Sequence, residues 1–309
     1  MHLLVPFASA RSEAGMYALR ELPLPALASL LRRLQPAGRL GTDEFSLNPP
    51  HECAWAAACG WQAGEGRLPF AAHAARRDGI EVLDLAWAQL TPVHWHVGRD
   101  EILLTDPSSL QLEEAESRAL LEAVRHLFET EGFAIAWGAP LRWYAAHECF
   151  ADLPTASLDR AVGRSVDRWL PEGPQARLLR RLQNEVQMLL YAHPLNEARE
   201  ARGALPVNSF WVSGCGRWQD SAAEEPQVDD RLRAPLLAED WAAWAEAWRA
   251  LDAGPLTTLA QRAARGEPAA LTLAGERFAQ RFEGDAGSWW SRLRRRWRPP
   301  APADVLESL

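Results

Sequence analysis

The sequence has no lysine, and this absence limits the chemistry that the chain can perform. All 33 basic residues among its 309 are arginine. A Schiff-base lysine, a lysine general base and a Walker-type lysine are therefore excluded. The formal net charge of −8 argues against nucleic acid as the main partner, because phosphate binding needs a basic surface.

Cysteines and long apolar runs are also scarce. The four cysteines have no CxxC spacing, so we expect reduced thiols rather than disulfides or zinc ligands. No stretch approaches the ~20 apolar residues of a membrane span. The N-terminal MHLLVPFAS has no basic segment, and its apolar run is too short for a signal peptide. We therefore expect a cytoplasmic protein that the membrane does not anchor.

Familiar catalytic motifs are missing as well. The sequence contains no HExxH, GxSxG or GxGxxG pattern. On these grounds no residue is assigned as catalytic, none as a metal ligand, and no cofactor is expected.

The elements that the sequence does predict mix strands and helices without a strict βαβ alternation. Strands are predicted at 3–7, over 82–104 with a turn at 98–100, and at 133–137, 141–144, 207–212 and 269–274. Helices are predicted at 16–22, 25–34, 50–59, 70–77, 111–131, 155–169, 178–190, 196–202, 240–251 and 256–265. We expect an α/β fold with a mixed, largely parallel central sheet flanked by helices. A single domain over 1–309 is predicted, with an exposed acidic loop or linker at 219–230.

The stretch 182–217 carries the main candidate site. It reads as a helix, a short capped helical turn, a strand and a glycine-rich loop at 213–217, and ligands of α/β sheets usually bind where strands end. The candidate ligand-binding residues are His193, Asn196, Arg199, Asn208, Trp211, Ser213, Gly214, Cys215, Gly216 and Arg217. The two glycines would let backbone amides approach an anion. The structural alternative is that these residues cap and brace a tight strand exit.

A second candidate site comprises His94, His96 and Arg99. On a strand the two imidazoles would face the same way and could reach one anion or one metal. The structural alternative is an exposed strand face above a buried Trp95.

Three further patterns have a structural and a functional interpretation. Arg160, Arg164 and Arg168 would form an arginine ridge on a helix at 155–169, typical of a solvated face and less often of an anion site. Tryptophans at 241, 244 and 248 with Leu251 predict a core-facing stripe. The arginine- and tryptophan-rich segment 288–299 predicts a terminal helix that docks on its own domain or makes a peripheral contact with a membrane or nucleic acid.

Several of these segments carry a resemblance to a known family. The stretch NEVQMLLYAHPLNEAREARGALPVNSFWVSGCG, together with TASLDRAVGRSVDRW, LTPVHWHVGRDEILLTDP and the opening MHLLVPFA, resembles the RpfE-type bacterial regulatory proteins. That family is described as similar to cofactor-independent phosphoglycerate mutases. The resemblance implies an alkaline-phosphatase-like core in reduced form.

The catalytic pattern of that superfamily does not carry over. Its chemistry needs two metals held by aspartate and histidine, including an aspartate just after the first strand. Here Pro6-Phe7-Ala8-Ser9 follows the strand, the first acid is Glu13, and no histidine follows His193. The resemblance therefore implies a relative without the di-metal site.

The leading hypothesis is a cytoplasmic regulatory or binding protein whose ligand is a small anion or a protein partner. One alternative is a metal-dependent phosphoester mutase or hydrolase that uses His94, His96 and a distant carboxylate. Another is a peripheral membrane or nucleic-acid contact through 288–299.

Overall fold

The computed structural model describes residues 1–284 and 300–309 and divides into two compact units. Unit 1 comprises Met1–Phe45, Pro49–Trp61 and the part of Ser221–Leu309 that the structure describes, and unit 2 comprises Ser46–Asn48 and Gln62–Asp220. The predicted linker at 219–230 contains the last boundary, and it also contains a two-residue strand. The basic segment 288–299 lies outside the described residues.

Unit 1 is built on a five-stranded sheet in the order β2-β11-β10-β1-β9. The strands are β1 (His2–Val5), β2 (Leu34–Gly41), β9 (Gln227–Val228), β10 (Ala270–Ala274) and β11 (Phe278–Gly284). Strand β1 pairs in parallel with β9 and β10, whereas β11 is antiparallel to both β10 and β2. The chain after residue 231 thus adds β10 and β11 to the sheet of the first strand.

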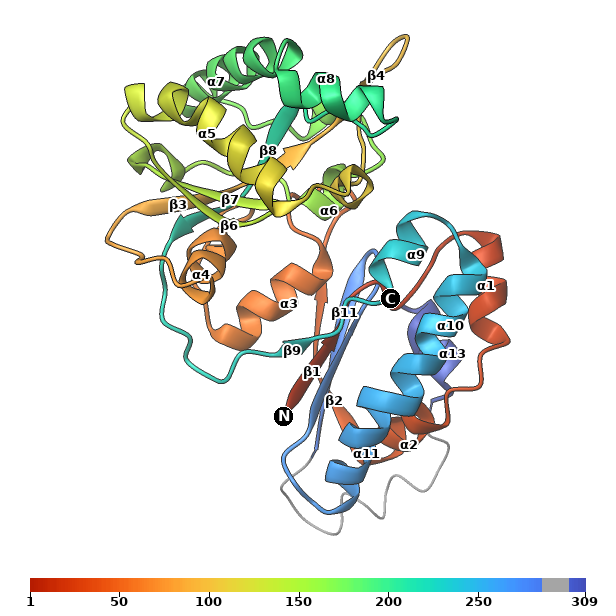
Figure 1. Cartoon of the computed structure of the whole chain (residues 1–309). Helices are drawn as coiled ribbons and strands as arrows, with labels where there is room; N and C mark the ends of the chain where they lie inside the picture. The colour runs from red at the N-terminus through yellow and green to blue at the C-terminus, as the bar shows by residue number, and fades with distance from the viewer. Residues whose placement is uncertain (285–299) are drawn as a thin grey trace. The chain divides into compact units, whose positions relative to one another are not determined.

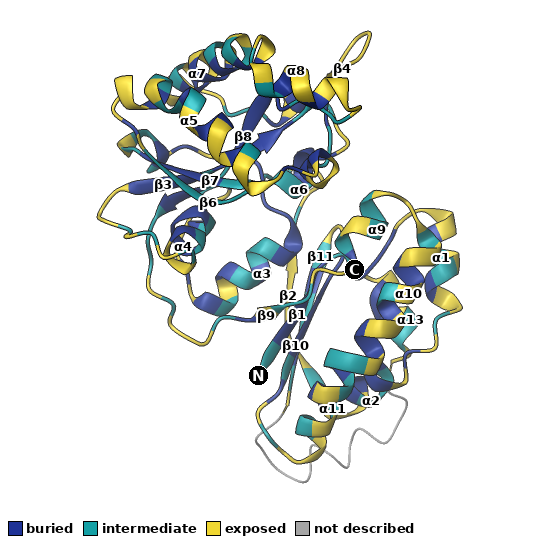
Figure 2. Cartoon of the chain, in the orientation of Figure 1, coloured by how far each residue is buried: buried dark blue, intermediate teal, exposed yellow. Residues whose placement is uncertain are grey.

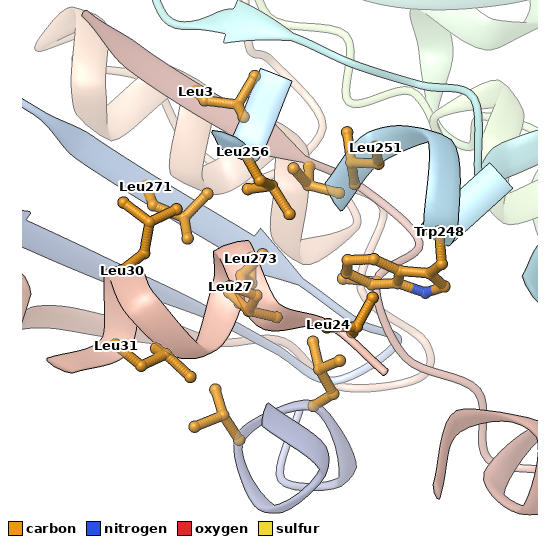
Figure 3. Packing of buried hydrophobic residues seen from close by; sticks show 14 of the residues in the cluster. Leu3, Leu24, Leu27, Leu30, Leu31, Trp248, Leu251, Leu256, Leu271 and Leu273 are labelled. Carbon is orange, nitrogen blue, oxygen red and sulfur yellow. The ribbon is translucent and has the colours of Figure 1, made fainter. Parts of the chain in front are cut away.

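Helices cover both faces of this sheet (Figure 1). One face carries α1 (Glu13–Arg20), α2 (Pro25–Arg33), α10 (Trp241–Leu251), α11 (Thr257–Ala264) and α13 (Pro302–Glu307). The other face carries α3 (Pro50–Cys59), and α9 (Arg233–Leu237) follows β9 in the chain. Figure 3 shows the leucines of α2 packed against Leu271, Leu273 and Trp248. The predicted tryptophan stripe is confirmed, because Trp244 and Trp248 are fully buried in this core.

Unit 2 contains a four-stranded antiparallel sheet in the order β6-β7-β3-β8 and a two-stranded hairpin, β4-β5. The strands are β3 (Ala86–Val93), β4 (Trp95–Val97), β5 (Ile102–Leu104), β6 (Ala134–Ala139), β7 (Arg142–Ala146) and β8 (Ser209–Arg217). The helices are α4 (Phe70–Arg77), α5 (Glu114–Thr130), α6 (Leu158–Ala161), α7 (Pro174–Tyr191) and α8 (Pro194–Ala201). Helices α5 and α7 cover the apolar face of the sheet and α4 packs on the other (Figures 1 and 2).

The mixed α/β class is confirmed, but less of the sheet is parallel than we predicted. Among the described strands, the two parallel strand pairings are both in unit 1, and the four-stranded sheet of unit 2 is antiparallel throughout. The presence of two compact units does not show whether each folds on its own, so the single domain over 1–309 stays a prediction.

The helix predicted at 155–169 is wrong. The structure has only the four-residue α6 and a short 3₁₀ turn at Val166–Arg168. Gly163 is left-handed, with φ of 73°, and its amide donates to the carbonyl of Leu104 in the hairpin at 2.8 Å. Pairing with the hairpin therefore replaces the helix, and Arg160, Arg164 and Arg168 do not share a helical face.

The glycine-rich loop predicted at 213–217 is also wrong, because these residues continue strand β8. The register against β3 shifts between Trp87 and Gln89, so β8 bulges around Gly214. Gly214 has a φ of 65°, and a Cβ there would lie 2.9 Å from the amide nitrogen of Ala71. The glycine allows the bulge and the close approach of α4, and it does not form an anion-binding loop.

Candidate functional site

The carboxyl edge of the parallel strands in unit 1 is the first place to look for a ligand site. The segments that follow β1 and β9 meet there, since the amide of Asp229 donates to the carbonyl of Leu4 at 3.0 Å. Phe7 has a φ of 57°, which is uncommon for a bulky residue. Its carbonyl accepts the indole N–H of Trp244 at 3.3 Å, and its ring lies 5.2 Å from that of His51. The turn after β1 is thus held in place by packing and by a hydrogen bond.

The acids at this edge do not form a two-metal donor set. Both carboxylate oxygens of Asp229 accept from the guanidinium of Arg231, each at 2.7 Å, and these hydrogen bonds raise the pKa of Arg231. No carboxylate follows β1 before Glu13. Within residues 1–284 and 300–309, no group of three or more His, Cys, Asp or Glu side chains could hold a metal ion. The residues present do not fit the metal centre that the superfamily resemblance implies.

The ten residues of the main candidate site do not form one cluster. Asn208 precedes β8 and Arg217 ends it, so the two lie about 30 Å apart at roughly 3.3 Å per residue. At one end, Asn208 accepts the amide of Trp95 at 2.7 Å and donates to its carbonyl at 2.9 Å. At the other end, Arg217 donates to the main-chain carbonyl of Asp84 at 3.0 Å and pairs with Glu148.

The residues around α8 hold that helix against the rest of unit 2. His193 is its N-cap, and the imidazole Nδ1 accepts the amide of Leu195 at 3.2 Å. Asn196 is buried and makes three hydrogen bonds, to Leu190 and to both main-chain groups of Val207. The side chains of His193 and Asn196 thus both make hydrogen bonds within unit 2.

Arg199 is the most deeply buried cation of the candidate set. Its side chain is fully buried and donates to the carbonyls of Leu205 and Leu110 and to the carboxylate of Glu116. Arg202 donates to the other oxygen of Glu116. Buried charge is stabilised only when it is paired in this way, so Arg199 fixes α8 to the start of α5.

The remaining members lie along β8 and show no reactive arrangement. Trp211 is buried, and its indole N–H donates to the carbonyl of Ala156 at 3.0 Å. Cys215 is fully buried, and burial raises the pKa of its thiol to about 12. A thiol with so high a pKa is protonated at neutral pH and is a poor nucleophile. Ser213 is half-buried and pairs with Gln89 across the sheet.

The second candidate set lies at and beyond the end of β3. His94 lies between β3 and β4, with Nδ1 2.9 Å from the carbonyl oxygen of Pro206. His96 and Arg99 are exposed on the β4-β5 hairpin, and Trp95 is buried. The hairpin projects from unit 2 in Figure 1. The predicted strand segment 82–104 is divided in the structure into β3, β4 and β5, and the turn predicted at 98–100 lies between β4 and β5. His94 lies in the link between β3 and β4, whereas His96 lies on β4.

Sequence reasoning missed a group of polar residues on the α4-side face of the unit 2 sheet. Gln89 and Thr91 on β3 share that face with Ser209 on β8, and Gln89 donates to the Thr91 hydroxyl at 3.0 Å. Thr91 and Ser209 are almost fully buried, and the Ser209 hydroxyl has no hydrogen-bond partner among the described residues. Every second residue of a strand faces the same side of its sheet, so this alternation along the two strands could have identified the group from the sequence.

Comparisons with known proteins give similarities in sequence and in structure. No protein-family model matches the chain. Over 123 residues, 38% of the chain, it is 29% identical to a protein of Geobacter sulfurreducens described as a probable 2,3-bisphosphoglycerate-independent phosphoglycerate mutase. The match spans only 30% of that protein.

The likenesses to solved structures are of low similarity. A cofactor-independent phosphoglycerate mutase from Thermoplasma acidophilum aligns over 99% of both chains at 14% identity, with a TM-score of 0.37. The PH0037 protein of Pyrococcus horikoshii aligns over 92% of this chain and 87% of its own, at 13% identity and a TM-score of 0.47. No helix among the described residues has the length and apolarity needed to cross a membrane. The sequence match thus relates the chain to proteins of the phosphoglycerate mutase type.

Proposed function

We propose that this phosphoglycerate mutase-like chain acts by binding a protein partner, as a regulatory protein, and not by two-metal phosphoryl transfer. One observation carries the proposal. At the carboxyl edge of β1 and β9, no carboxylate follows β1 before Glu13, and the Asp229 carboxylate pairs with Arg231. Two-metal chemistry requires several acidic and histidine ligands that converge on one point.

A protein partner is favoured over a small anion because the cations of the predicted anion site already have hydrogen-bond partners within unit 2. The cations of the predicted anion site, Arg199 and Arg217, already bond to acceptors of unit 2. Large apolar side chains are exposed instead on α7 and on the β4-β5 hairpin, where Val97 is 73% exposed. Exposed apolar groups next to cations are typical of protein interfaces.

A small anionic ligand is the second candidate, and the buried Ser209 hydroxyl favours it. A buried hydroxyl without a partner costs about 1–3 kcal/mol, and a bound water or ligand would satisfy it. A thermal-shift screen of phosphorylated metabolites tests this candidate, with Ser209→Ala as the control. A stabilising metabolite whose effect Ser209→Ala removes would replace the protein partner as the ligand.

The metal content of the purified full-length chain tests the proposal. The protein would be expressed and purified without chelators and analysed for zinc, manganese, magnesium and iron. We expect far less than one metal ion per chain. Asp230 follows Asp229 directly after β9. Near-stoichiometric metal that is lost in an Asp229→Ala/Asp230→Ala or His94→Ala/His96→Ala variant would contradict the proposal and restore the phosphoester enzyme alternative.

A further inference from the structure

The outward face of α7 differs from an ordinary solvated helix face. Helix α7 buries Ala176, Leu179, Leu182, Gln183, Val186 and Leu190. After the first two residues of the helix, which are also exposed, the exposed positions 177, 180, 181, 184, 188 and 191 fall within an arc of about 100° on the opposite side, at 100° per residue. We call these six residues the α7 outer face.

The second half of this face is apolar. Met188 is 77% exposed and Tyr191 is 90% exposed, and they lie three residues apart on the last turn of the helix. Apolar side chains of this size gain favourable free energy when a partner buries them, and Met and Tyr are enriched at interfaces. The pair is therefore suited to contact an apolar surface of a partner.

The first half of the face is cationic. Arg177 has no ion-pair partner among the residues that the structure describes. Arg180 donates to the carbonyl of Pro171 at 2.9 Å and has no carboxylate partner in the part of the chain that the structure describes. Arg181 pairs with Glu131 and, at 3.8 Å, with Glu185. Two cations without a carboxylate partner among the described residues thus lie roughly two to four turns from the apolar pair.

Helix α5 provides an internal comparison, since it covers the same face of the sheet. Its exposed Arg118 pairs with Glu114 at 2.8 Å, and Arg125 pairs with Glu122 at 2.7 Å. None of the large apolar side chains exposed in the described chain belongs to α5. Mutually paired charges without apolar groups are typical of a solvated face, so the pattern on α7 is a local feature of that helix.

We propose that the α7 outer face is the docking surface for an acidic amphipathic helix of a partner protein, which deepens the proposed function and rests on it. The partner's carboxylates would face Arg177 and Arg180, and its apolar residues would cover Met188 and Tyr191. The surface runs ~21 Å from residue 177 to residue 191, the length of a peptide helix of about four turns. The two arginines favour a partner surface with negative charge, because interface charges are complementary. The exposed apolar pair favours a helix that also has an apolar side.

The test uses the full-length chain and a fluorescently labelled 18-residue helical peptide with glutamates on one side and leucines with one phenylalanine on the other. A control peptide has the same sequence with lysine in place of each glutamate. Fluorescence anisotropy should show that the acidic peptide binds with a Kd below about 100 μM and that the basic control peptide does not. Raising the salt concentration from about 0.05 M to about 0.5 M should weaken binding, since exposed charges are screened.

Variants locate the binding on the face. Arg177→Glu/Arg180→Glu should weaken binding at least ~10-fold, and Met188→Ser/Tyr191→Ser should do the same. A Leu83→Ser/Arg249→Glu variant changes an exposed leucine and an exposed arginine elsewhere and should leave the Kd unchanged. All four residues of the two test variants are exposed, so the fold should remain intact, as circular dichroism would show.

Three results would overturn the inference. They are no binding below about 100 μM, equal binding of the two peptides, or binding that the α7 variants leave unchanged. Self-association of the chain that Met188→Ser/Tyr191→Ser abolishes would also overturn it, because the face would then bind a second copy. None of these results depends on metal content, so failure here is distinguishable from failure of the proposed function.

Discussion

The hydroxyl of Ser117 joins two tryptophans to the main chain in the core of unit 2. It accepts the indole N–H of Trp137 at 3.0 Å and that of Trp143 at 2.9 Å, and it donates to the carbonyl of Pro140 at 2.8 Å. Sequence alone could not predict this group, because the residues come from a helix, a turn and two strands. The Ser209 hydroxyl is equally buried but has no partner among the described residues.

The two serines form a matched pair for mutagenesis. Ser117→Ala leaves the buried indole of Trp143 without an acceptor, so it should lower the free energy of unfolding by about 1–3 kcal/mol. Ser209→Ala removes a buried hydroxyl that has no partner among the described residues, so it should not lower the free energy of unfolding and should raise it by up to about 1–3 kcal/mol. Urea unfolding followed by tryptophan fluorescence measures both. Equal losses in the two variants would contradict the assigned hydrogen bonds.

Asp78 carries a pH-dependent part of the stability of unit 2. Its carboxylate accepts two bonds from Arg142, each at 2.8 Å, and one from the Tyr144 hydroxyl at 2.7 Å. The hydrogen bonds from Arg142 lower the pKa of Asp78 below its ordinary value of 3.8, and burial opposes them. A lowered folded-state pKa contributes stability above the unfolded-state pKa, and this stability is lost as the pH falls through the folded-state pKa.

Asp78→Asn should therefore be more destabilising near neutral pH than in acid. The difference in unfolding free energy between wild type and variant should shrink between about pH 6 and about pH 3. Urea titrations at several pH values provide the measurement. A difference that stays constant over this range would show that the charge on Asp78 does not stabilise the folded state.

At the scale of elements, helices whose ends carry local signals were predicted well. The prediction for α3 at 50–59 is confirmed at both ends, where Pro50 occupies the first turn and Gly60 is left-handed with a φ of 76°. The segment 155–169 has cap and turn residues too, yet its pairing with the hairpin decides the structure. Strand β2, with Pro36 and two glycines on the edge of the sheet, gave no strand pattern at all.

Helix α2 shows why some helix ends cannot be read from the sequence. It has no capping side chain of its own, and its first amides, those of Ala26 and Leu27, donate to the buried carboxylate of Asp252 at 3.0 and 2.9 Å. Asp252 is 225 residues away from Leu27 in the sequence. The cap is thus a tertiary contact that joins α2 to the turn between α10 and α11.

Removing this distant cap should destabilise unit 1. Asp252→Ala leaves two buried amides unpaired and should cost about 1–3 kcal/mol. Asp252→Asn keeps one acceptor oxygen and should cost less. Chemical unfolding of the two variants gives the comparison, and an Asp252→Ala protein as stable as wild type would rule out the capping role.

At the scale of the whole molecule, the chain crosses between the two units at four boundaries, and unit 2 is inserted within the sequence of unit 1. The acidic stretch at 219–230 signals the last crossing, but the earlier ones near Phe45, Asn48 and Trp61 carry no change in composition. The sequence therefore predicted the α/β class and most elements, and it did not predict the division. The residues of the candidate site are close in sequence, but β8 is extended and separates them along its length.

The central proposal is that this chain, part of which is similar to a probable phosphoglycerate mutase, does not perform metal-dependent mutase chemistry. The most direct measurement is the interconversion of 3- and 2-phosphoglycerate by the purified full-length chain with added manganese, cobalt, zinc or magnesium, alongside an active mutase as positive control. We predict no turnover above the protein-free background with any of these metals. Metal-dependent turnover that an Asp229→Ala/Asp230→Ala variant loses would contradict the account and show that a catalytic metal site forms at the end of β9.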